Sequence, residues 1–276
     1  MRIRTVSASI VLYQNPEGDL TSCLGSLEKT DVQTIYVIDN SPDERLKSVA
    51  NSSSLVNYIH NPANPGYGAG HNIGMKKSLE SGFQYHLVIN ADISFEGNII
   101  RDIVEHLDVN TSVGALMPKV LYPNGEKQHL CKFIPSPYDL LARRFLPISL
   151  KEVNEKKFKM MDYNHSMILS VPYLSGCFMF LRNESISNIG LFDERFFMYP
   201  EDIDLSRRIA QKYETIYFPK VTVVHKHEEA SRKSNFMLFV HIWNMMKYFQ
   251  KWGWFSDRNR KILNCAAAEK NRGAKL

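Results

Sequence analysis

Short runs of β-branched and aromatic residues alternate with amphipathic stretches along the first part of the chain. The apolar runs predict strands at 6–13, 34–38, 55–60, 86–89 and 114–120. Between them, apolar residues recur at helical spacing, as at Leu20, Leu24 and Leu27, and again over 99–107. This alternation predicts an α/β protein with a mostly parallel sheet and helices on both of its faces.

The pattern weakens after the fifth predicted strand. Residues 122–170 hold a turn signal, prolines and a basic run at 151–159. These features predict either a poorly regular insertion over the site or a solvated loop. A longer apolar run at 172–182 predicts another strand, and two short runs follow at 215–218 and 221–224. These features extend the α/β pattern to the point where the last strand ends.

The C-terminal part has a different pattern. Residues 235–255 carry a broad apolar face at helical spacing, with basic residues near the end. Two interpretations remain open: a helix packed on the main domain, or an amphipathic helix at a membrane interface, with contacts from Lys251, Trp252 and Trp254. We therefore predict a nucleotide-binding and catalytic domain over 1–234 and a C-terminal helical extension over 235–276.

Polar residues interrupt the pattern where predicted strands end. Asp39 and Asn40 follow the second strand, and Asn90 and Asp92 follow the fourth. In open α/β sheets, ligands bind beyond the carboxyl ends of the strands, so we expect these residues to converge on one cleft. Taken singly, Asp92 is equally well explained as the cap of a turn.

Glycines occupy alternate positions after the third predicted strand, at Gly66, Gly68 and Gly70. They allow close backbone approach, and we expect a helix to begin just after them with its free N–H groups facing a diphosphate. The G-x-G-x-G spacing differs from the dinucleotide fingerprint. Flanking polar side chains favour a nucleotide contact over a turn without a ligand: Asn64, His71 and Asn72.

A cluster of acids follows the aromatic residues 196–199. Pro200 suits the first position of a helix, which places Glu201 and Asp202 in its first turn. One interpretation is that the acids only stabilise the helix N-terminus. The other is a catalytic carboxylate beside an apolar wall, with its pKa kept low by the helix N-terminus. Further along, His225 ends the last strand and is either a metal ligand or a structural histidine.

Composition and charge change the picture in three ways. The four cysteines show no metal-type spacing, which predicts reduced thiols in a cytoplasmic protein. No apolar run approaches the roughly 20 residues of a membrane span, and residues 6–13 read as a strand rather than a signal peptide. The net charge of +5 is uneven, because residues 206–276 hold 15 Lys/Arg and 5 Asp/Glu. That surplus suggests an anionic partner, either phosphate groups or a membrane surface.

Six motifs taken in order resemble the bacterial family 2 glycosyltransferases, and most of all the rhamnosyltransferases of O-antigen and cell-wall polysaccharide assembly. They are D-N (39–40), N-P-G-Y-G-A-G-H-N-I-G (64–74), N-A-D (90–92), S-G-C-F-M-F-L-R (175–182), Y-P-E-D-I-D-L-S-R-R (199–208) and H-K-H-E-E-A-S (225–231). The resemblance covers about residues 5–255. It implies a GT-A (Rossmann-like) fold, a nucleotide-sugar donor and inversion at the anomeric carbon.

The resemblance also implies roles for individual residues. Asp202 would be the catalytic base, and Asp92 and His225 would bind Mg²⁺ or Mn²⁺, with Asn90 standing where the family often has a first Asp. The donor nucleotide is expected to meet Tyr13, Asp39, Asn40, Asn64, Gly66, Gly68, Asn72 and Asn90. The acceptor side is expected at Gly176, Tyr199 and Glu201.

The expected reaction moves L-rhamnose from dTDP-L-rhamnose onto a lipid-linked saccharide at the cytoplasmic face of the membrane, where the protein would be peripheral. Other donors remain open, namely UDP-galactofuranose, UDP-GlcNAc and UDP-glucose, as does a non-catalytic nucleotide-binding module. A nucleic-acid-binding protein would explain the basic C-terminal quarter but leave the N-terminal acids and glycines without a use. We therefore expect no nucleic-acid partner.

Overall fold

The computed structural model describes residues 5–139, 148–226 and 235–276. Within these ranges a nine-stranded sheet has the order β3-β2-β1-β4-β8-β6-β9-β5, and β7 pairs with β9 off this path. The strands are β1 (Val6–Leu12), β2 (Thr34–Asp39), β3 (Val56–His60), β4 (Tyr85–Ile89), β5 (Ile93–Ser94), β6 (Val113–Leu121), β7 (Leu169–Ser170), β8 (Phe178–Arg182) and β9 (Glu214–His225).

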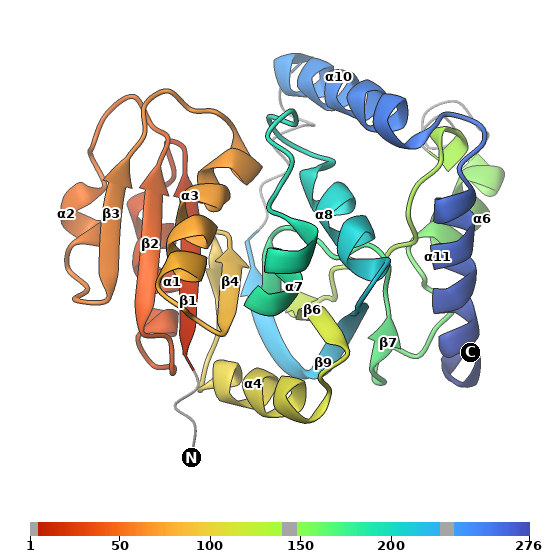
Figure 1. The fold of residues 1–276 in the computed structure, drawn as a ribbon, viewed down its shortest axis with the longest axis horizontal. Coiled ribbons are helices and arrows are strands. Elements are labelled where there is room, and N and C mark those ends of the chain that lie inside the picture. The colour runs from red at the N-terminus through yellow and green to blue at the C-terminus, as the bar shows by residue number, and fades with distance from the viewer. Residues whose placement is uncertain (1–4, 140–147, 227–234) are drawn as a thin grey trace.

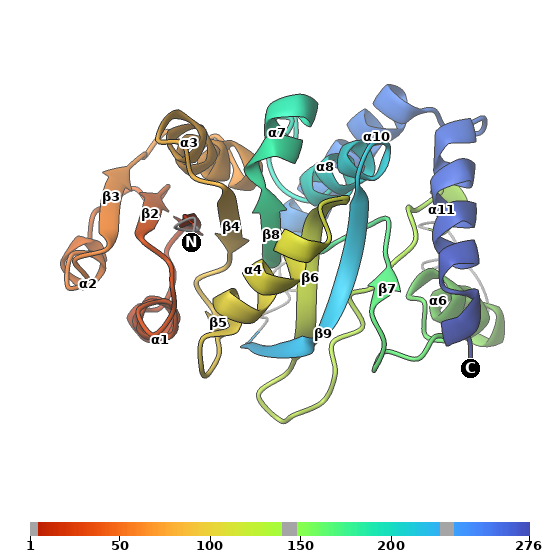
Figure 2. The same cartoon turned by 60° about the horizontal axis from the view of Figure 1, so that its bottom comes forward.

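Helices cover both faces of this sheet (Figures 1 and 2). On one face lie α1 (Glu17–Leu27), α2 (Lys47–Ala50) and α4 (Ile99–Val109). On the other lie α3 (Tyr67–Glu80), α7 (Asn183–Ile189) and α8 (Glu201–Ala210). The chain also forms α6 (Ile148–Phe158), α10 (Asn235–Trp252), α11 (Arg258–Lys270) and the 3₁₀ helix η1 (Arg272–Ala274).

The hydrophobic core is divided by the sheet into two clusters. In β8, Phe178 and Phe180 point to the cluster under α1 and α4, whereas Met179 and Leu181 point to the cluster under α3, α7 and α8. Successive side chains of a strand face opposite sides, so a strand buried on both faces is apolar throughout. This explains why the central strands read as continuous apolar runs.

The sheet is parallel in its first half and mixed in its second. β3, β2, β1 and β4 are parallel neighbours, as the strand–helix alternation predicted. β8 runs antiparallel to both β4 and β6, and β9 is one strand, parallel to β6, where two short runs were predicted. The reversal brings the start of β8 to the carboxyl end of β4, where the Asn90 N–H donates to the Cys177 carbonyl at 2.9 Å.

The first turn of α3 contains the alternating glycines, because the helix begins at Tyr67 rather than after them. Gly66 has a φ of 109°, and a Cβ there would overlap the backbone oxygen of Phe197. A Cβ at Gly70 would lie 2.8 Å from a methyl carbon of Val11. These glycines therefore let α3 pack directly against β1 and the loop before α8, and their contact with a diphosphate stays a prediction.

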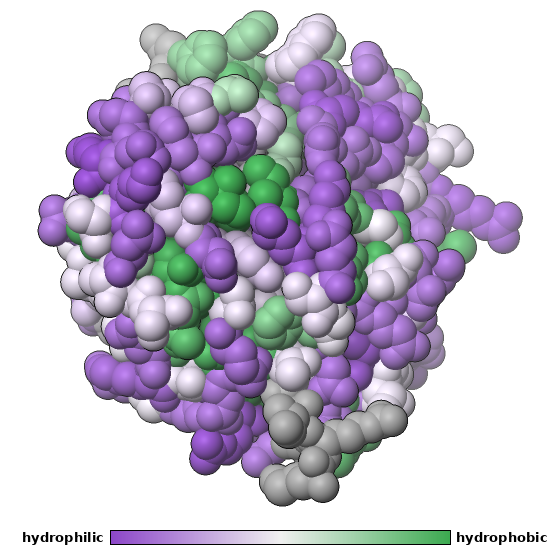
Figure 3. All heavy atoms as spheres, turned by 60° about the vertical axis from the view of Figure 1, so that its left-hand side comes forward, coloured by the Kyte–Doolittle hydropathy of each residue, from purple (hydrophilic) through white to green (hydrophobic). Residues whose placement is uncertain are grey.

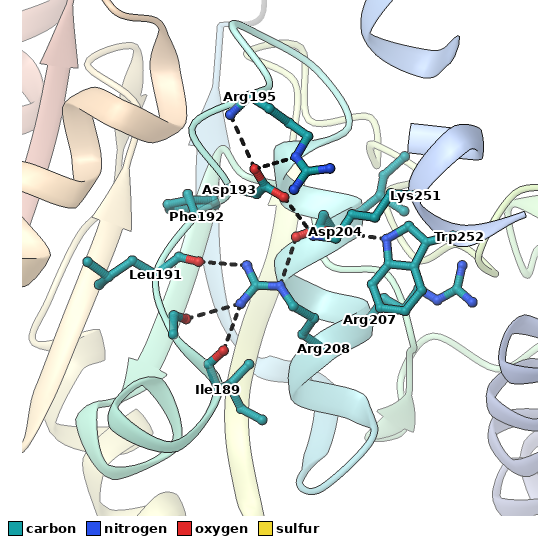
Figure 4. A network of polar contacts seen from close by, with 12 residues as sticks. Ile189, Leu191, Phe192, Asp193, Arg195, Asp204, Arg207, Arg208, Lys251 and Trp252 are labelled. Atoms are coloured by element: carbon teal, nitrogen blue, oxygen red, sulfur yellow. Dashed lines mark hydrogen bonds and ion pairs between the residues drawn. The ribbon is translucent and has the colours of Figure 1, made fainter. Parts of the chain in front are cut away.

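The C-terminal helices pack on the main body of the protein. The Arg207 guanidinium of α8 is fully buried, contacts both carboxylate oxygens of Asp257 at 2.5 and 2.8 Å, and lies 3.9 Å from the ring of Trp252. Asp204 accepts from the Trp252 indole N–H at 2.8 Å and pairs with Lys251 at 2.6 Å (Figure 4). We call Asp204, Arg207, Lys251, Trp252 and Asp257 the α8–α10 anchor. The domain boundary at 234 stays a prediction.

The predicted insertion is only partly irregular, because α6 covers most of its basic run. On the face that Figure 3 shows, hydrophobic side chains form small patches separated by hydrophilic ones, as is usual for a surface facing water. Among the helices that the structure describes, none has the length and apolarity of a membrane span.

Candidate active site

The predicted site residues gather at the carboxyl edge of the parallel strands. The Asn40 amide donates to the Gly66 carbonyl at 3.4 Å, in the turn that leads into α3. From the next residue, the Tyr67 hydroxyl lies 2.8 Å from both the Asn90 Oδ1 and the Gly176 carbonyl oxygen. The Gly176 N–H in turn donates to Asp202. Five distant segments are thus joined by one series of hydrogen bonds, as the predicted convergence required.

Asp202 lies in the first turn of α8, which follows Pro200 at the N-cap. Its Oδ2 accepts from the Gly176 N–H at 3.0 Å and from the Tyr173 hydroxyl at 3.4 Å. Burial raises the pKa of Asp202 above its ordinary value, although the Gly176 N–H and the charge of Lys132 oppose this shift. The predicted low pKa is wrong, because the loss of hydration outweighs the effect of the helix N-terminus.

Glu201 precedes this carboxylate and is buried more deeply. Its Oε2 has no hydrogen-bond partner among the described residues, and its Cγ would lie 3.3 Å from a Cβ at Gly68. Burial, and then the neighbouring Asp202, raise the pKa of Glu201 well above its ordinary value. The structure therefore favours the protonated, neutral form of Glu201 beside an Asp202 that is more basic than usual.

Asp92 and His225 meet at the ends of β4 and β9. The Asp92 Oδ2 lies 3.3 Å from the His225 Nε2, and the His225 Nδ1 lies 3.0 Å from the Gln128 Oε1. Burial lowers the pKa of His225, but hydrogen bonds to the side chains of Asp92 and Cys177 outweigh it and raise this pKa to about 10. The remainder of the H-K-H-E-E-A-S motif, from residue 227, lies outside the described residues.

This pair fits a divalent cation in its chemistry, because a carboxylate oxygen and an imidazole nitrogen face the same point. Among the residues that the structure describes, no group of three or more His, Cys, Asp and Glu is arranged to hold a metal. Asn90 is engaged with Tyr67, so it does not complete the set. The described part of the chain offers two ligands, and a bound diphosphate and water could supply others.

The residues predicted for the donor nucleotide occupy different environments. Asp39 is buried at the end of β2, where it accepts from the Ser41 N–H at 3.0 Å and from the Tyr58 hydroxyl at 2.8 Å. Tyr13 is exposed just beyond β1, and Asn64 has a φ of 42° in the turn before α3. Contacts of these three side chains with a nucleotide stay predictions.

Two of the predicted side-chain donors face the interior instead. The Asn72 side chain, 1% exposed, donates to the Phe192 carbonyl and accepts from the Phe192 N–H at 2.9 and 3.0 Å. The His71 Nδ1 lies 2.7 Å from the Ser9 hydroxyl, deep under α3. Helical periodicity turns both side chains toward the core, and their contact with a donor stays a prediction.

On the predicted acceptor side, Gly176, Tyr199 and Glu201 all lie near Asp202. Tyr199 has a φ of 66°, and its ring packs edge-on against the ring of His241 in α10, with centroids 4.8 Å apart. Figure 1 shows α10 on the side to which the arrows of β2 and β3 point. The C-terminal helix is thus a neighbour of the candidate site.

Sequence reasoning missed four residues that contact the site directly: Tyr67, Gln128, Lys132 and Tyr173. Tyr67 stands within the glycine motif, so an aromatic residue between two glycines was the available signal. Gln128 and Lys132 lie in a stretch without regular periodicity, and Tyr173 lies in the apolar run 172–182, which indicated only a strand. Their contacts depend on pairings far along the chain, and the local pattern carried no sign of them.

The comparisons with known proteins agree with this geometry. The model of the family described as "Glycosyl transferase family 2" matches residues 7–190. The chain belongs to this family. Two curated relatives of this family 2 chain are the low-salt glycan biosynthesis hexosyltransferase Agl10 of Haloferax volcanii and the N-acetylglucosaminyl-diphospho-decaprenol L-rhamnosyltransferase of Mycobacterium tuberculosis. The first is 27% identical over 205 residues and the second 26% identical over 144 residues.

The match to the Haloferax protein covers 74% of this family 2 chain and 61% of that protein. The match to the mycobacterial protein covers 50% of this chain and 46% of that protein. Among solved structures, GalNAc-T7 with UDP, GalNAc and Mn²⁺ has a TM-score of 0.67 at 16% identity, covering 98% of this chain and 52% of that one. The mannosyltransferase PcManGT from Pyrobaculum calidifontis, with GDP-Man and Mn²⁺, has a TM-score of 0.59 at 16% identity, covering 95% and 69%. These likenesses confirm the predicted GT-A fold.

Proposed function

We propose that this family 2 protein is an inverting glycosyltransferase that moves a hexose from a nucleotide-sugar donor onto a lipid-linked saccharide. The observation that carries the proposal is the Asp202 carboxylate, held at 3.0 Å by the N–H of Gly176, a residue that the Tyr67 hydroxyl links to Asn90. L-Rhamnose from dTDP-L-rhamnose is the first candidate for the donor, because one curated relative is a rhamnosyltransferase with a decaprenol-linked substrate.

In this mechanism, Asp202 accepts the proton of the acceptor hydroxyl as the oxygen attacks the anomeric carbon. The Gly176 N–H and the Tyr173 hydroxyl both contact Oδ2 and hold the carboxylate in a fixed orientation. Its raised pKa makes Asp202 a stronger base than an exposed aspartate. Glu201, kept neutral by burial, avoids a second negative charge next to the base.

Asp92 and His225 would hold Mg²⁺ or Mn²⁺ on the donor diphosphate. A divalent cation supplies charge stabilisation to the phosphate that leaves. The Tyr67 hydroxyl contacts both the Asn90 side chain, two residues before Asp92, and the Gly176 carbonyl, whose own N–H holds Asp202. Asp39 and Tyr13 are the candidates for contacts with the nucleoside, because they end neighbouring strands at the same edge.

Turnover assays with different donors test the proposal. dTDP-rhamnose, UDP-galactofuranose, UDP-GlcNAc, UDP-glucose and GDP-sugars are offered with a polyprenyl-diphosphate-linked saccharide and Mg²⁺ or Mn²⁺. Asp202→Asn should lower turnover by roughly 10²–10⁴-fold while a thermal shift with the donor persists. Donor binding without turnover in the wild type would instead favour a non-catalytic nucleotide-binding module.

We also propose that α10 contacts a membrane surface, which would place the protein peripherally at the cytoplasmic face. Phe236, Phe239 and Trp243 of α10 are 68%, 62% and 50% exposed, and their spacing puts them on one face with Met246. Trp252 and Lys251, expected at the membrane from the sequence, are instead part of the α8–α10 anchor. The exposed apolar face of α10 supports this proposal in place of Trp252 and Lys251.

A further inference from the structure

Gln128 binds His225 through two hydrogen bonds from 97 residues away in the chain. It follows β6, and its own N–H donates to the Val120 carbonyl at 2.9 Å, which fixes the backbone from which the side chain extends. Gln128 is 5% exposed and His225 4% exposed. Water therefore does not compete freely for this pair of contacts, and both hydrogen bonds are strongly oriented.

The geometry determines which way the Gln128 amide points. One end of the amide lies 2.8 Å from the His225 backbone oxygen, and a carbonyl oxygen only accepts hydrogen bonds. That end must be the Nε2 group, so the amide oxygen faces the His225 Nδ1 at 3.0 Å. An amide oxygen also only accepts, and the His225 Nδ1 must therefore carry a hydrogen.

The hydrogen at Nδ1 determines how the opposite ring nitrogen, Nε2, can take part in metal binding. A neutral imidazole carries one hydrogen, and the Asp92 carboxylate alone would draw it to Nε2, 3.3 Å away. In that tautomer a hydrogen would stand between the two candidate ligands. With one hydrogen held at Nδ1, Nε2 is the nitrogen that gives up its hydrogen when a cation binds, and its lone pair then serves as the ligand beside Asp92, as a metal-binding histidine requires.

We propose that Gln128 is a positioning residue that holds His225 in the Nδ1–H tautomer, so that Nε2 and Asp92 bind a divalent cation together. This inference rests on the metal-assisted transfer proposed above. Gln128 itself does not touch the cation or the substrates. It acts through the orientation and tautomer of His225, and removal of such outer hydrogen bonds weakens metal binding by about 10–100-fold.

The test measures Mn²⁺ binding rather than activity. Free Mn²⁺ is followed by electron paramagnetic resonance while the full chain is titrated in the presence of a nucleoside diphosphate. Gln128→Leu should raise the Kd for Mn²⁺ by about 10–100-fold. Gln128→Glu should fall between it and the wild type, because the carboxylate accepts from Nδ1 but does not donate to the carbonyl. Gln211→Leu, at the exposed C-cap of α8, is the matched control and should leave the Kd unchanged.

Equal Mn²⁺ affinity in Gln128→Leu and the wild type would overturn the inference. If Gln128→Leu does not fold, the same comparison with Gln128→Glu decides it. A wild type that transfers sugar without binding Mn²⁺ would also refute the role of Gln128 and leave the transfer function intact. Gln128-dependent Mn²⁺ binding in a protein that transfers no sugar would support the inference and refute the proposed function.

Discussion

The ion pair between Arg207 and Asp257 gives a sharp test of how α11 and α10 are held against α8. Both side chains are almost fully buried, at 0% and 3% exposure. Asp257→Asn keeps the shape of the side chain and, through its amide oxygen, its role as N-cap of α11, where the Arg260 N–H donates to Oδ1. It removes the charge and one of the two oxygens that accept from Arg207. Arg207 then remains charged and buried, with neutral partners at Asn259 and Tyr248.

We expect Asp257→Asn to lower the free energy of unfolding by about 3–5 kcal/mol, the usual cost of leaving one charge of a buried pair uncompensated. For a chain of this size that corresponds to roughly 6–15 °C in Tm. Urea unfolding, followed by circular dichroism, measures the free energy, and a thermal scan measures Tm. The Trp252 ring also contacts Arg207, so its fluorescence reports on the same region.

Two further variants make the result decisive. Glu214→Gln breaks the exposed pair with Lys270 and should cost only about 0–1 kcal/mol. Replacing both members of the buried pair, as Arg207→Met with Asp257→Leu, should recover much of the stability lost in Asp257→Asn. A loss below about 1 kcal/mol in Asp257→Asn would refute the reasoning, because it would mean that the guanidinium is adequately solvated or paired without Asp257.

Three other predictions follow from the site and from α10. Folding raises the pKa of Glu201, so its protonated side chain stabilises the folded state at low pH, and this stabilisation is lost as pH rises. In urea titrations between about pH 5 and about pH 8, the free energy of unfolding should therefore fall less in Glu201→Gln than in the wild type. Because the pKa of Asp202 is also raised, kcat should fall on acidification at a higher pH than an ordinary aspartate gives, and an acid limb at the ordinary value would contradict its role as base. Phe239→Ser with Trp243→Ser should reduce co-sedimentation with anionic liposomes, whereas Val109→Ser, exposed on α4, should not; equal loss in both would remove α10 as the membrane contact.

Local patterns predicted much of the site because its chemistry follows the ends of regular elements. Asp39, Asp92 and His225 each stand where an apolar strand ends, and strand ends are visible in a single sequence. Pro200 marked the start of α8 and so the position of Asp202 in its first turn. The parallel arrangement of the first four strands then brings such positions to one edge.

The orientation of side chains near the glycine motif was not visible in the same way. Residues 66–74 read as a loop because glycine weakens any helical pattern, but the structure makes most of them the first two turns of α3. Once the helix begins at Tyr67, its periodicity turns His71 and Asn72 toward the core. Their polarity is satisfied by Ser9 and Phe192, residues that local spacing does not connect to them.

By itself, the sequence determined the α/β class, the strand ends that carry the candidate ligands and the helix that carries the candidate base. These depend on periodicity and on turn residues, which act over a few positions. Only the tertiary structure decided the reversal of β8, the raised pKa of Asp202, the contacts of Lys251 and Trp252 with Asp204, and the contact of Gln128 with His225. Each of these depends on burial or on pairing between distant segments, and a local pattern contains no information about either.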